Sequence, residues 1–287
     1  MKSEFGAQSV TSPDGRVVLS FELNSEGEAL YAVTFAGEEI IAPSHLGIET
    51  SRGEFDEDMR IVDIKTSTFN ETWEPVWGQY AKIENHYNEM VVALQNENGE
   101  CVDITFRLFN DGAALRYTLR GEGVCDILDE ETEFRMARDC FAHWMAGSDD
   151  DAEFNYMHTP LSGINTQSMH KSAGRVQDIL ECGVATPVAM KTPAGNYIAL
   201  HEAALWSYPG MALDFDAEEL CFTTELSGDS EVKSRVELPF STPWRTIIVG
   251  DRVGTLVESS MVLNLNEPCA LEDTSWIKPM KYVGVWW

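Results

Sequence analysis

Aromatic side chains and hydrogen-bonding groups gather in two short segments that lie close together in the sequence. The first segment, residues 72–78, contains Trp73 and Trp77, and the second, residues 85–89, contains His86. Aromatic faces can stack on sugar rings, and the polar groups beside them can bond the sugar hydroxyls. The segments therefore predict carbohydrate binding by Trp73, Trp77 and His86. The alternative is that both indoles pack into the core and that the imidazole is buried with a partner.

A histidine and a glutamate stand side by side at the end of an apolar run. Residues 198–205 are apolar except for His201 and Glu202. Neighbouring side chains of a strand point to opposite faces, so only one of the two can face a given site. A carboxylate in apolar surroundings needs a cation or hydrogen-bond donors. Glu202 is thus predicted to be half of a buried ion pair or a metal ligand. His143 and the acidic residues 149–151 are weaker candidates.

The charge of the chain excludes whole classes of function. Its 287 residues include 48 Asp and Glu but only 20 Lys and Arg, which gives a formal net charge of −28. Nucleic acids and anionic membrane surfaces are bound by basic patches, so neither is an expected partner. The sequence has no apolar run of about 18 residues that could span a membrane. The 6 cysteines form no CxxC pair and are predicted to be buried free thiols.

The elements that must position these residues are strands. Short runs of alternating apolar and polar residues recur along the chain, separated by turns such as Pro13-Asp14-Gly15 and Asn98-Gly99. Such runs predict antiparallel strands. They lie at residues 16–23, 29–35, 90–95, 101–109, 114–119, 131–136, 186–191, 196–201, 219–226 and 244–249. One short helix is predicted at residues 253–260. The pattern indicates an all-β protein, a single large antiparallel sandwich of two big sheets.

Several longer segments resemble one family of carbohydrate-active enzymes. They are residues 12–15, 71–78, 85–89, 107–112, 201–205, 242–248 and 263–287. Over nearly its whole length the chain resembles the N-terminal domain of glycoside hydrolase family 97, which includes bacterial α-glucosidases and α-galactosidases. The resemblance implies a large β-supersandwich similar to galactose mutarotase-like folds, over residues 1–275. Residues 276–287 would be a linker and the first strand of the (β/α)₈ catalytic barrel that follows in the family.

The resemblance also implies roles for residues. The catalytic carboxylates of the family lie in the barrel, so this chain would hold no catalytic residue and would be inactive alone. The complete enzymes bind calcium, and Glu202 would supply one ligand. Because Ca²⁺ takes 6–8 oxygen ligands, we do not expect this domain to bind calcium by itself. We expect Glu202 on the face that the barrel covers, partly open to water. The family also implies a periplasmic or secreted enzyme, although the sequence shows no signal peptide.

Three functions are consistent with these residues. The first is a non-catalytic domain of a calcium-dependent α-glycoside hydrolase, which packs on its barrel and helps to bind an α-linked oligosaccharide. The second is a free-standing carbohydrate-binding module, in which Trp206 would be a further stacking platform. The third is a mutarotase-like epimerase. That reaction would need His86 or His201 to face one sugar together with Glu89 or Glu202.

The end of the chain carries one further prediction. Residues 283–287 read as an apolar strand with two tryptophans, and no partner strand follows in the sequence. Exposed apolar strands associate with one another, so we expect self-association through this segment. The sequence leaves open whether the substrate is an α-glucoside or an α-galactoside, and whether hydrolysis inverts or retains the anomeric configuration.

Overall fold

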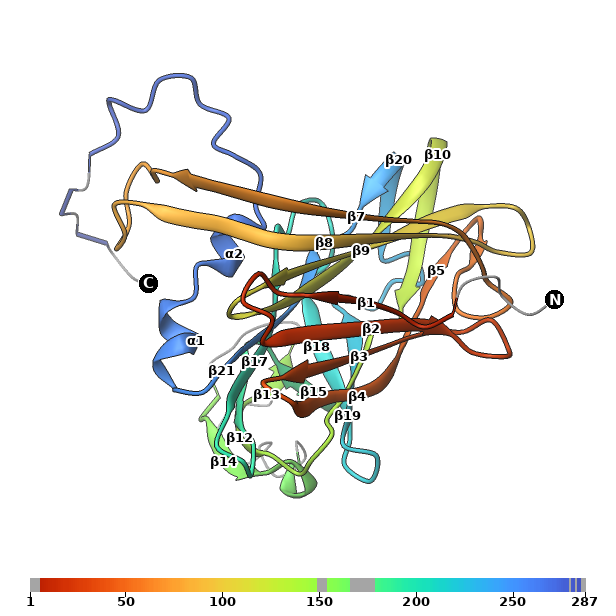
Figure 1. Ribbon diagram of the computed structural model, residues 1–287, viewed down its shortest axis with the longest axis horizontal. Helices are drawn as coiled ribbons and strands as arrows, with labels where there is room; N and C mark the ends of the chain where they lie inside the picture. Colours follow the sequence, from red (N-terminus) through yellow and green to blue (C-terminus); the bar gives the residue numbers. More distant parts are fainter. Residues whose placement is uncertain (1–5, 149–153, 166–178, 279, 282, 285–287) are drawn as a thin grey trace.

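Three antiparallel sheets make up the described part of the chain (Figure 1). The structure is a computed structural model, and it describes residues 6–148, 154–165, 179–278, 280, 281, 283 and 284. No helix within these residues is both long and apolar enough to cross a membrane.

The largest sheet has twelve strands among the described residues. Nine of them follow one another across the sheet in the order β14(Met157–Pro160), β12(Phe141–Trp144), β16(Val188–Lys191), β17(Tyr197–Ala203), β21(Trp244–Gly250), β10(Gly112–Glu130), β9(Cys101–Phe109), β8(Ile83–Gln95) and β7(Arg60–Trp73). The long strand β10 also pairs with β20(Ser234–Ser241) and with β5(Ile48–Thr50), which pairs with β6(Gly53–Glu54).

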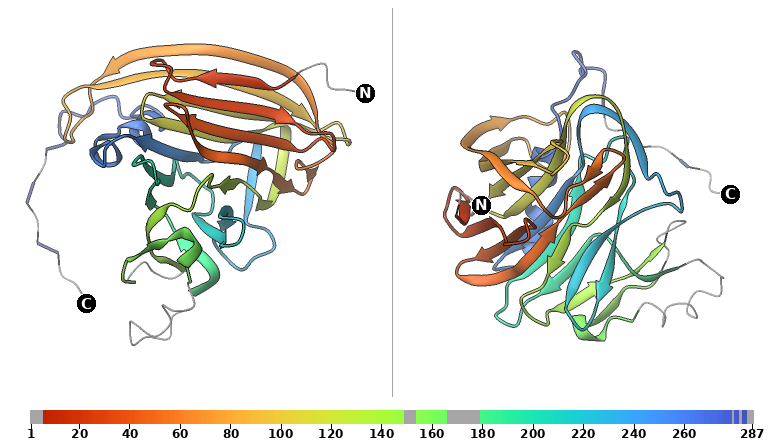
Figure 2. Two further views of the ribbon diagram at one scale, coloured as in Figure 1. Left: turned by 60° about the horizontal axis from the view of Figure 1, so that its bottom comes forward. Right: turned by 90° about the vertical axis from the view of Figure 1, so that its right-hand side faces the viewer.

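Two smaller sheets cover one face of the large sheet. A four-stranded sheet has the order β1(Gln8–Thr11), β2(Val17–Leu23), β3(Ala29–Phe35), β4(Glu38–Leu46). A five-stranded sheet has the order β11(Glu133–Arg135), β19(Cys221–Leu226), β18(Met211–Asp216), β15(Ile179–Ala185), β13(Ala146–Ser148). Figure 2 shows the four-stranded sheet, in red and orange, beside β8 and β9.

The main core lies between the large sheet and the two small ones, because alternate residues of each strand point inward. In β2, Val17, Leu19 and Phe21 are buried while Ser20 is exposed. The ring of Phe21 lies 5.7 Å from that of Phe106 on β9, so these two sheets meet directly. The predicted all-β supersandwich is therefore confirmed.

The opposite face of the large sheet is covered by two short helices, α1(Gly254–Glu258) and α2(Met261–Asn264). Met261 of α2 packs on a second apolar cluster that includes Trp244 and Ile248 of β21. The helix predicted at residues 253–260 thus corresponds to α1, and α2 follows it as a separate turn.

The long hairpin of β7 and β8 extends past the body of the sheets and over α2 (Figure 1). Three hydrogen bonds fasten its end to the helices. The indole Nε1 of Trp73 donates to Oδ1 of Asn264 over 2.9 Å, and Nδ2 of Asn264 donates to the carbonyl oxygen of Glu84 over 2.9 Å. The hydroxyl of Tyr80 donates to the carbonyl oxygen of Glu258 over 3.1 Å.

The prediction that every cysteine is buried needs correction, and the prediction of a strand at the end of the chain stays open. Cys125, Cys140 and Cys221 are buried free thiols as predicted, but Cys101 is only partly buried and Cys269 is exposed. The apolar strand predicted at residues 283–287 lies mostly outside the described residues, so it and the self-association remain predictions.

Gly112 is required by the close approach of β10 to β21. A Cβ added there would overlap the carbonyl oxygen of Ile247 and lie 3.0 Å from Cα of Ile248 and 3.1 Å from Sδ of Met261. We expect Gly112→Ala to lower the free energy of unfolding by about 1–3 kcal/mol through overpacking. Urea denaturation measures the loss.

Gly163→Ala is the matched control for that measurement. The nearest atom to an added Cβ at Gly163 is Cβ of Thr159 at 3.5 Å, an ordinary van der Waals contact. This variant should change the free energy of unfolding by no more than about 0.5 kcal/mol. Equal stabilities of the two variants would contradict the steric argument for Gly112.

Candidate functional site

Glu202 lies in a buried network of charged and polar groups inside the sandwich. The alternation of β17 directs Ile198, Leu200 and Glu202 toward the main core, and it directs His201 to the opposite face. The residue is 9% exposed. Its Oε2 accepts a hydrogen bond from Nη1 of Arg245 over 2.8 Å, and its Oε1 accepts one from the backbone N–H of Met211 over 3.2 Å.

Arg245 is the centre of this network. It is 0% exposed, and it lies directly across from Glu202 in the register of β17 and β21. Its Nε and Nη2 donate to the two carboxylate oxygens of Glu130, at 2.7 and 2.6 Å. Burial alone would lower the pKa of Arg245, but the charge and hydrogen bonds of Glu130 raise it above the ordinary value. The guanidinium is therefore permanently charged between two carboxylates.

Two hydroxyl groups donate further hydrogen bonds to the carboxylate of Glu130. Tyr208 donates to its Oε2 over 3.0 Å and Thr132 to its Oε1 over 2.9 Å, while the hydroxyls of Thr132 and Tyr117 are 2.8 Å apart. Burial and the charge of Glu130 raise the pKa of both Tyr117 and Tyr208, so both phenols stay protonated as donors.

The network has more negative than positive charge. Glu130 and Glu202 face one guanidinium, so one carboxylate charge is not balanced by a cation within the network. Glu130 and Arg245 are fully buried, whereas Glu202 retains a small exposed fraction. The excess charge is therefore closest to solvent at Glu202. Groups of three or more His, Cys, Asp or Glu side chains that could hold a metal ion do not occur in the described ranges.

The expectation that Glu202 is partly open to water is wrong. Its side chain is buried, and it forms the ion pair with a cation of the same domain that the residue types left open as an alternative. Arg245 was not among the residues predicted from the sequence. The available signal was an arginine within residues 244–250, a strand whose other members are apolar, small or Thr.

The loop after Glu202 combines strained backbone with exposed apolar side chains. Ala204 and Ser207 adopt φ values of 56° and 52°, in the left-handed region that non-glycine residues rarely occupy. Between them, Leu205 is 45% exposed and Trp206 is 71% exposed. Strain of this kind costs about 1–3 kcal/mol per residue and persists where the surroundings fix the conformation, often beside a functional site. The loop thus presents an apolar surface at the end of β17.

The three residues predicted to bind sugar do not converge on one site. Trp73 is half-buried and its N–H is used by Asn264, as described above. Trp77, at the end of the hairpin, is 60% exposed. His86 lines a cleft of about 410 Å³ that neither tryptophan lines. Their role in binding sugar therefore remains a prediction.

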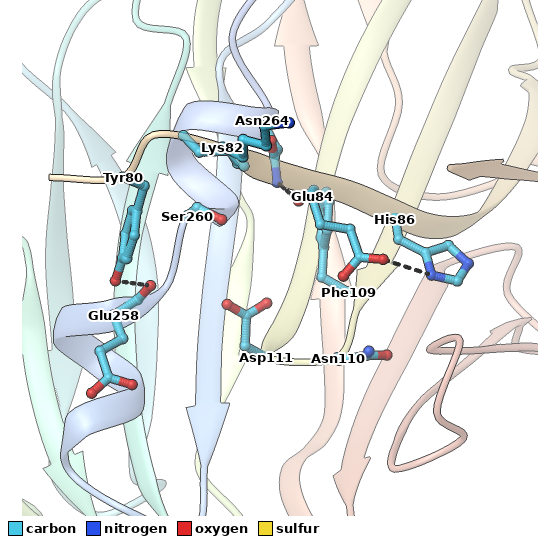
Figure 3. Close-up of a pocket in the computed structure, with 11 residues that line it drawn as sticks. Tyr80, Lys82, Glu84, His86, Phe109, Asn110, Asp111, Glu258, Ser260 and Asn264 are labelled. Atoms are coloured by element: carbon cyan, nitrogen blue, oxygen red, sulfur yellow. Dashed lines mark hydrogen bonds and ion pairs between the residues drawn. The ribbon is translucent and has the colours of Figure 1, made fainter. Parts of the chain in front are cut away.

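The cleft beside His86 is polar and lies between β8 and the two helices (Figure 3). Glu84, Asp111 and Glu258 line it, and the carboxylate of Glu258 is paired with Arg252. Burial raises the pKa of Asp111. Oε1 of Glu84 lies 4.0 Å from Nδ1 of His86. The remaining lining residues are Tyr80, Lys82, Ile83, Phe109, Asn110, Ser260 and Asn264. Only His86 of this cleft was a sequence candidate, because the cleft is assembled from three segments that are distant in sequence, residues 80–86, 109–111 and 258–264.

The histidine and carboxylate pairs needed by an epimerase are far apart. His201 and Glu89 share one face of the large sheet, but β17 and β8 are separated by four strand spacings, about 19 Å in total. His86 of β8 and Glu202 of β17 share the other face of the sheet, and the same four strand spacings separate them. Within each strand, His201 and Glu202, like His86 and Glu89, point to opposite faces. General acid–base chemistry on one sugar by these pairs is not supported.

One protein family and several of its members are similar to this chain over nearly its whole length. The model of the family described as Glycosyl-hydrolase 97 N-terminal matches residues 10–268. A probable retaining α-galactosidase of Streptomyces bingchenggensis is 26% identical over 98% of this chain and 40% of its own length. A retaining α-galactosidase of Bacteroides thetaiotaomicron is 22% identical over 97% of this chain and 44% of its own length. The chain thus spans less than half of these relatives.

Solved structures agree in fold. A variant of a glycoside hydrolase family 97 enzyme from Pseudoalteromonas sp. strain K8 superposes with a TM-score of 0.84 at 29% identity, over 95% of this chain and 40% of that one. The enzyme of the same strain in complex with acarbose has a TM-score of 0.82 at 28% identity, with the same coverage.

Proposed function

Because the chain belongs to the Glycosyl-hydrolase 97 N-terminal family, we propose that it is the non-catalytic N-terminal part of an α-glycoside hydrolase. The observation that carries this proposal is the match of the family model to residues 10–268 of a chain that covers 40% of a probable retaining α-galactosidase. A (β/α)₈ barrel needs about 250 residues, which the remainder of such a relative can supply. The catalytic carboxylates belong to that part, and a retaining mechanism needs two of them about 5–5.5 Å apart.

We further propose that the end of β17 faces the catalytic part and that Glu202 supplies one carboxylate ligand to its calcium ion. Three features support this. The network around Glu202 holds an excess negative charge, which a cation would balance. Both carboxylate oxygens are held in place by Arg245 and Met211, which fixes their position. The adjacent loop exposes Leu205 and Trp206, which suits packing against another domain.

The residues fit calcium only in part. Carboxylate oxygen is a ligand that Ca²⁺ prefers, and each oxygen of Glu202 has a lone pair beyond its present hydrogen bond. The other ligands would come from the catalytic part, since the residues that the structure describes gather no second carboxylate at an open position beside Glu202. This chain alone is therefore proposed to bind calcium weakly or not at all.

A second candidate function, carbohydrate binding, rests on the cleft in Figure 3. Its volume of about 410 Å³ suits a sugar ring, and its Asp, Glu, Asn and Tyr groups match the bonding needs of hydroxyls. Isothermal titration with an α-linked oligosaccharide, in the chain and in Asp111→Ala, distinguishes this candidate. Binding that disappears in the variant would support it.

The test of the main proposal measures glycoside hydrolysis. The chain alone should show no turnover of nitrophenyl α-galactoside or α-glucoside above buffer, because it lacks the catalytic carboxylates of the family. A longer product of the same gene that includes a (β/α)₈ barrel should hydrolyse one of them. Turnover by the chain alone that survives repurification would overturn the proposal.

A further inference from the structure

Two histidines face each other on the neighbouring strands at one end of the large sheet. His143 of β12 and His158 of β14 are direct partners in the antiparallel register. Their imidazole rings are stacked, with centroids 3.9 Å apart and planes inclined by 20°. Both side chains are exposed. They are not part of the network around Glu202 and Arg245.

The surroundings of the pair limit how its rings can move. The ring of Phe141 meets that of His158 edge-on, with centroids 4.2 Å apart, and it lies two residues from His143 on the same face of β12. The pair borders a hollow of about 390 Å³ whose other walls come from β16, β17 and the start of α1. Besides the two histidines, the titratable groups lining it are Lys191 and Tyr197, and the Lys191 ammonium lies 5.3 Å from the Tyr197 ring.

We propose that His143 and His158 form a two-histidine site for a late first-row transition-metal ion, Cu²⁺, Ni²⁺ or Zn²⁺. Imidazole nitrogen is the protein ligand that these ions share. The site is independent of the calcium site proposed at Glu202, because hard cations such as Ca²⁺ select oxygen ligands.

Binding one ion requires both rings to turn out of their stacked arrangement. A metal–nitrogen bond is about 2.0–2.1 Å long, so two nitrogens bound to one ion at 90–110° lie roughly 2.9–3.4 Å apart. The ring centroids are 3.9 Å apart, so the two imidazoles are close enough to reach one ion. Because a metal–nitrogen bond lies in the plane of its ring, the two nearly parallel rings must turn until one nitrogen of each points to the ion. No third His, Cys, Asp or Glu joins the pair among the residues described, so water would complete the coordination.

The protonation state of the pair also favours a metal. A metal binds neutral imidazole, and protons compete with it. Burial lowers the pKa of His143, and the neighbouring charge of a protonated His158 lowers it further. The lowered pKa of His143 lessens the competition from protons at that ligand. A bound ion would link β12 to β14, which ends the sheet, and would stabilise that edge.

The test is titration of the full 287-residue chain, free of any histidine tag, with Cu²⁺ at pH 7.5. We expect one site in isothermal titration and at least a tenfold loss of affinity in both His143→Asn and His158→Asn. His86→Asn, which removes a histidine elsewhere, should bind as the unaltered chain does. Ca²⁺ should give no heat at this site. Binding should also weaken as the pH falls through the ordinary histidine range near 6.5.

A second measurement separates two-histidine binding from a general loss of structure. The paramagnetic resonance spectrum of the Cu²⁺ complex should show two equatorial nitrogens in the unaltered chain and one in either variant. Circular dichroism should be the same in all of them, because both side chains are exposed. Affinity that is unchanged in both variants, or reduced equally by His86→Asn, would overturn the proposal.

Discussion

Arg245→Met is expected to lower the free energy of unfolding of the chain by about 3–5 kcal/mol, the usual cost of removing one partner from a buried ion pair. Methionine keeps most of the volume of the side chain but leaves Glu130 and Glu202 without their cation. Both carboxylates are buried, so water cannot fully replace the three hydrogen bonds that the guanidinium donates to them. Chemical denaturation followed by tryptophan fluorescence gives the value.

Two controls show whether the loss comes from buried charge. Arg235→Met removes a bidentate pair with Asp126 in which the arginine side chain is 70% exposed, so it should cost far less stability than Arg245→Met. Arg245→Lys keeps the charge but cannot bind both oxygens of Glu130, and its effect should fall between the two. If Arg245→Met costs no more than Arg235→Met, the network does not stabilise the fold as described.

The second large effect concerns Glu202 in a longer protein that includes the catalytic part. Glu202→Gln is expected to weaken calcium binding by at least about 10- to 100-fold, because groups that merely support a ligand already contribute that much. In the chain alone the same change should cost only about 1–2 kcal/mol of stability. It removes the charge that Arg245 does not balance and leaves the Arg245–Glu130 pair in place.

Calcium titration monitored by thermal unfolding measures this effect. Glu219→Gln is the control, because Glu219 is also paired with an arginine but its side chain is 64% exposed. It should leave the calcium dependence unchanged. Unaltered calcium affinity in Glu202→Gln would remove Glu202 from the metal site. A loss of stability as large as that of Arg245→Met would indicate a purely structural role.

Much of the fold was predictable because its signals are local. The Asn98-Gly99 turn between two alternating runs correctly predicted the β8–β9 hairpin, with β9 at 101–109 as expected. The start of β8 was missed, because residues 83–89 are mainly polar and their partners lie in the exposed strand β7. Alternation cannot reveal a strand whose two faces are both polar.

The candidate site was less predictable because it depends on partners distant in sequence. Residues 198–205 indicated correctly that Glu202 needs a cation or donors. The identity of that cation follows from the pairing of β17 with β21, which places Arg245 opposite Glu202. Glu130 arrives from a third strand, at the end of β10. Similarly, the sequence predicted that Trp73 and His86 contribute to one sugar-binding site. In the sheet they lie at different positions along the β7–β8 hairpin.

The pairing of β10 with β21 in the large sheet also determines when, during synthesis, β10 can gain its second neighbouring strand. Gly112 of β10 bonds with Ile248 of β21, so this edge of β10 stays open until more than a hundred further residues have been synthesised. At about 5–20 residues per second, that interval is on the order of ten seconds. During it the β8–β10 meander can form locally, but the edge of β10 that pairs with β21 has no partner strand. Because an unpaired strand edge is a template for pairing with another chain, this edge of β10 is open to intermolecular association for that interval.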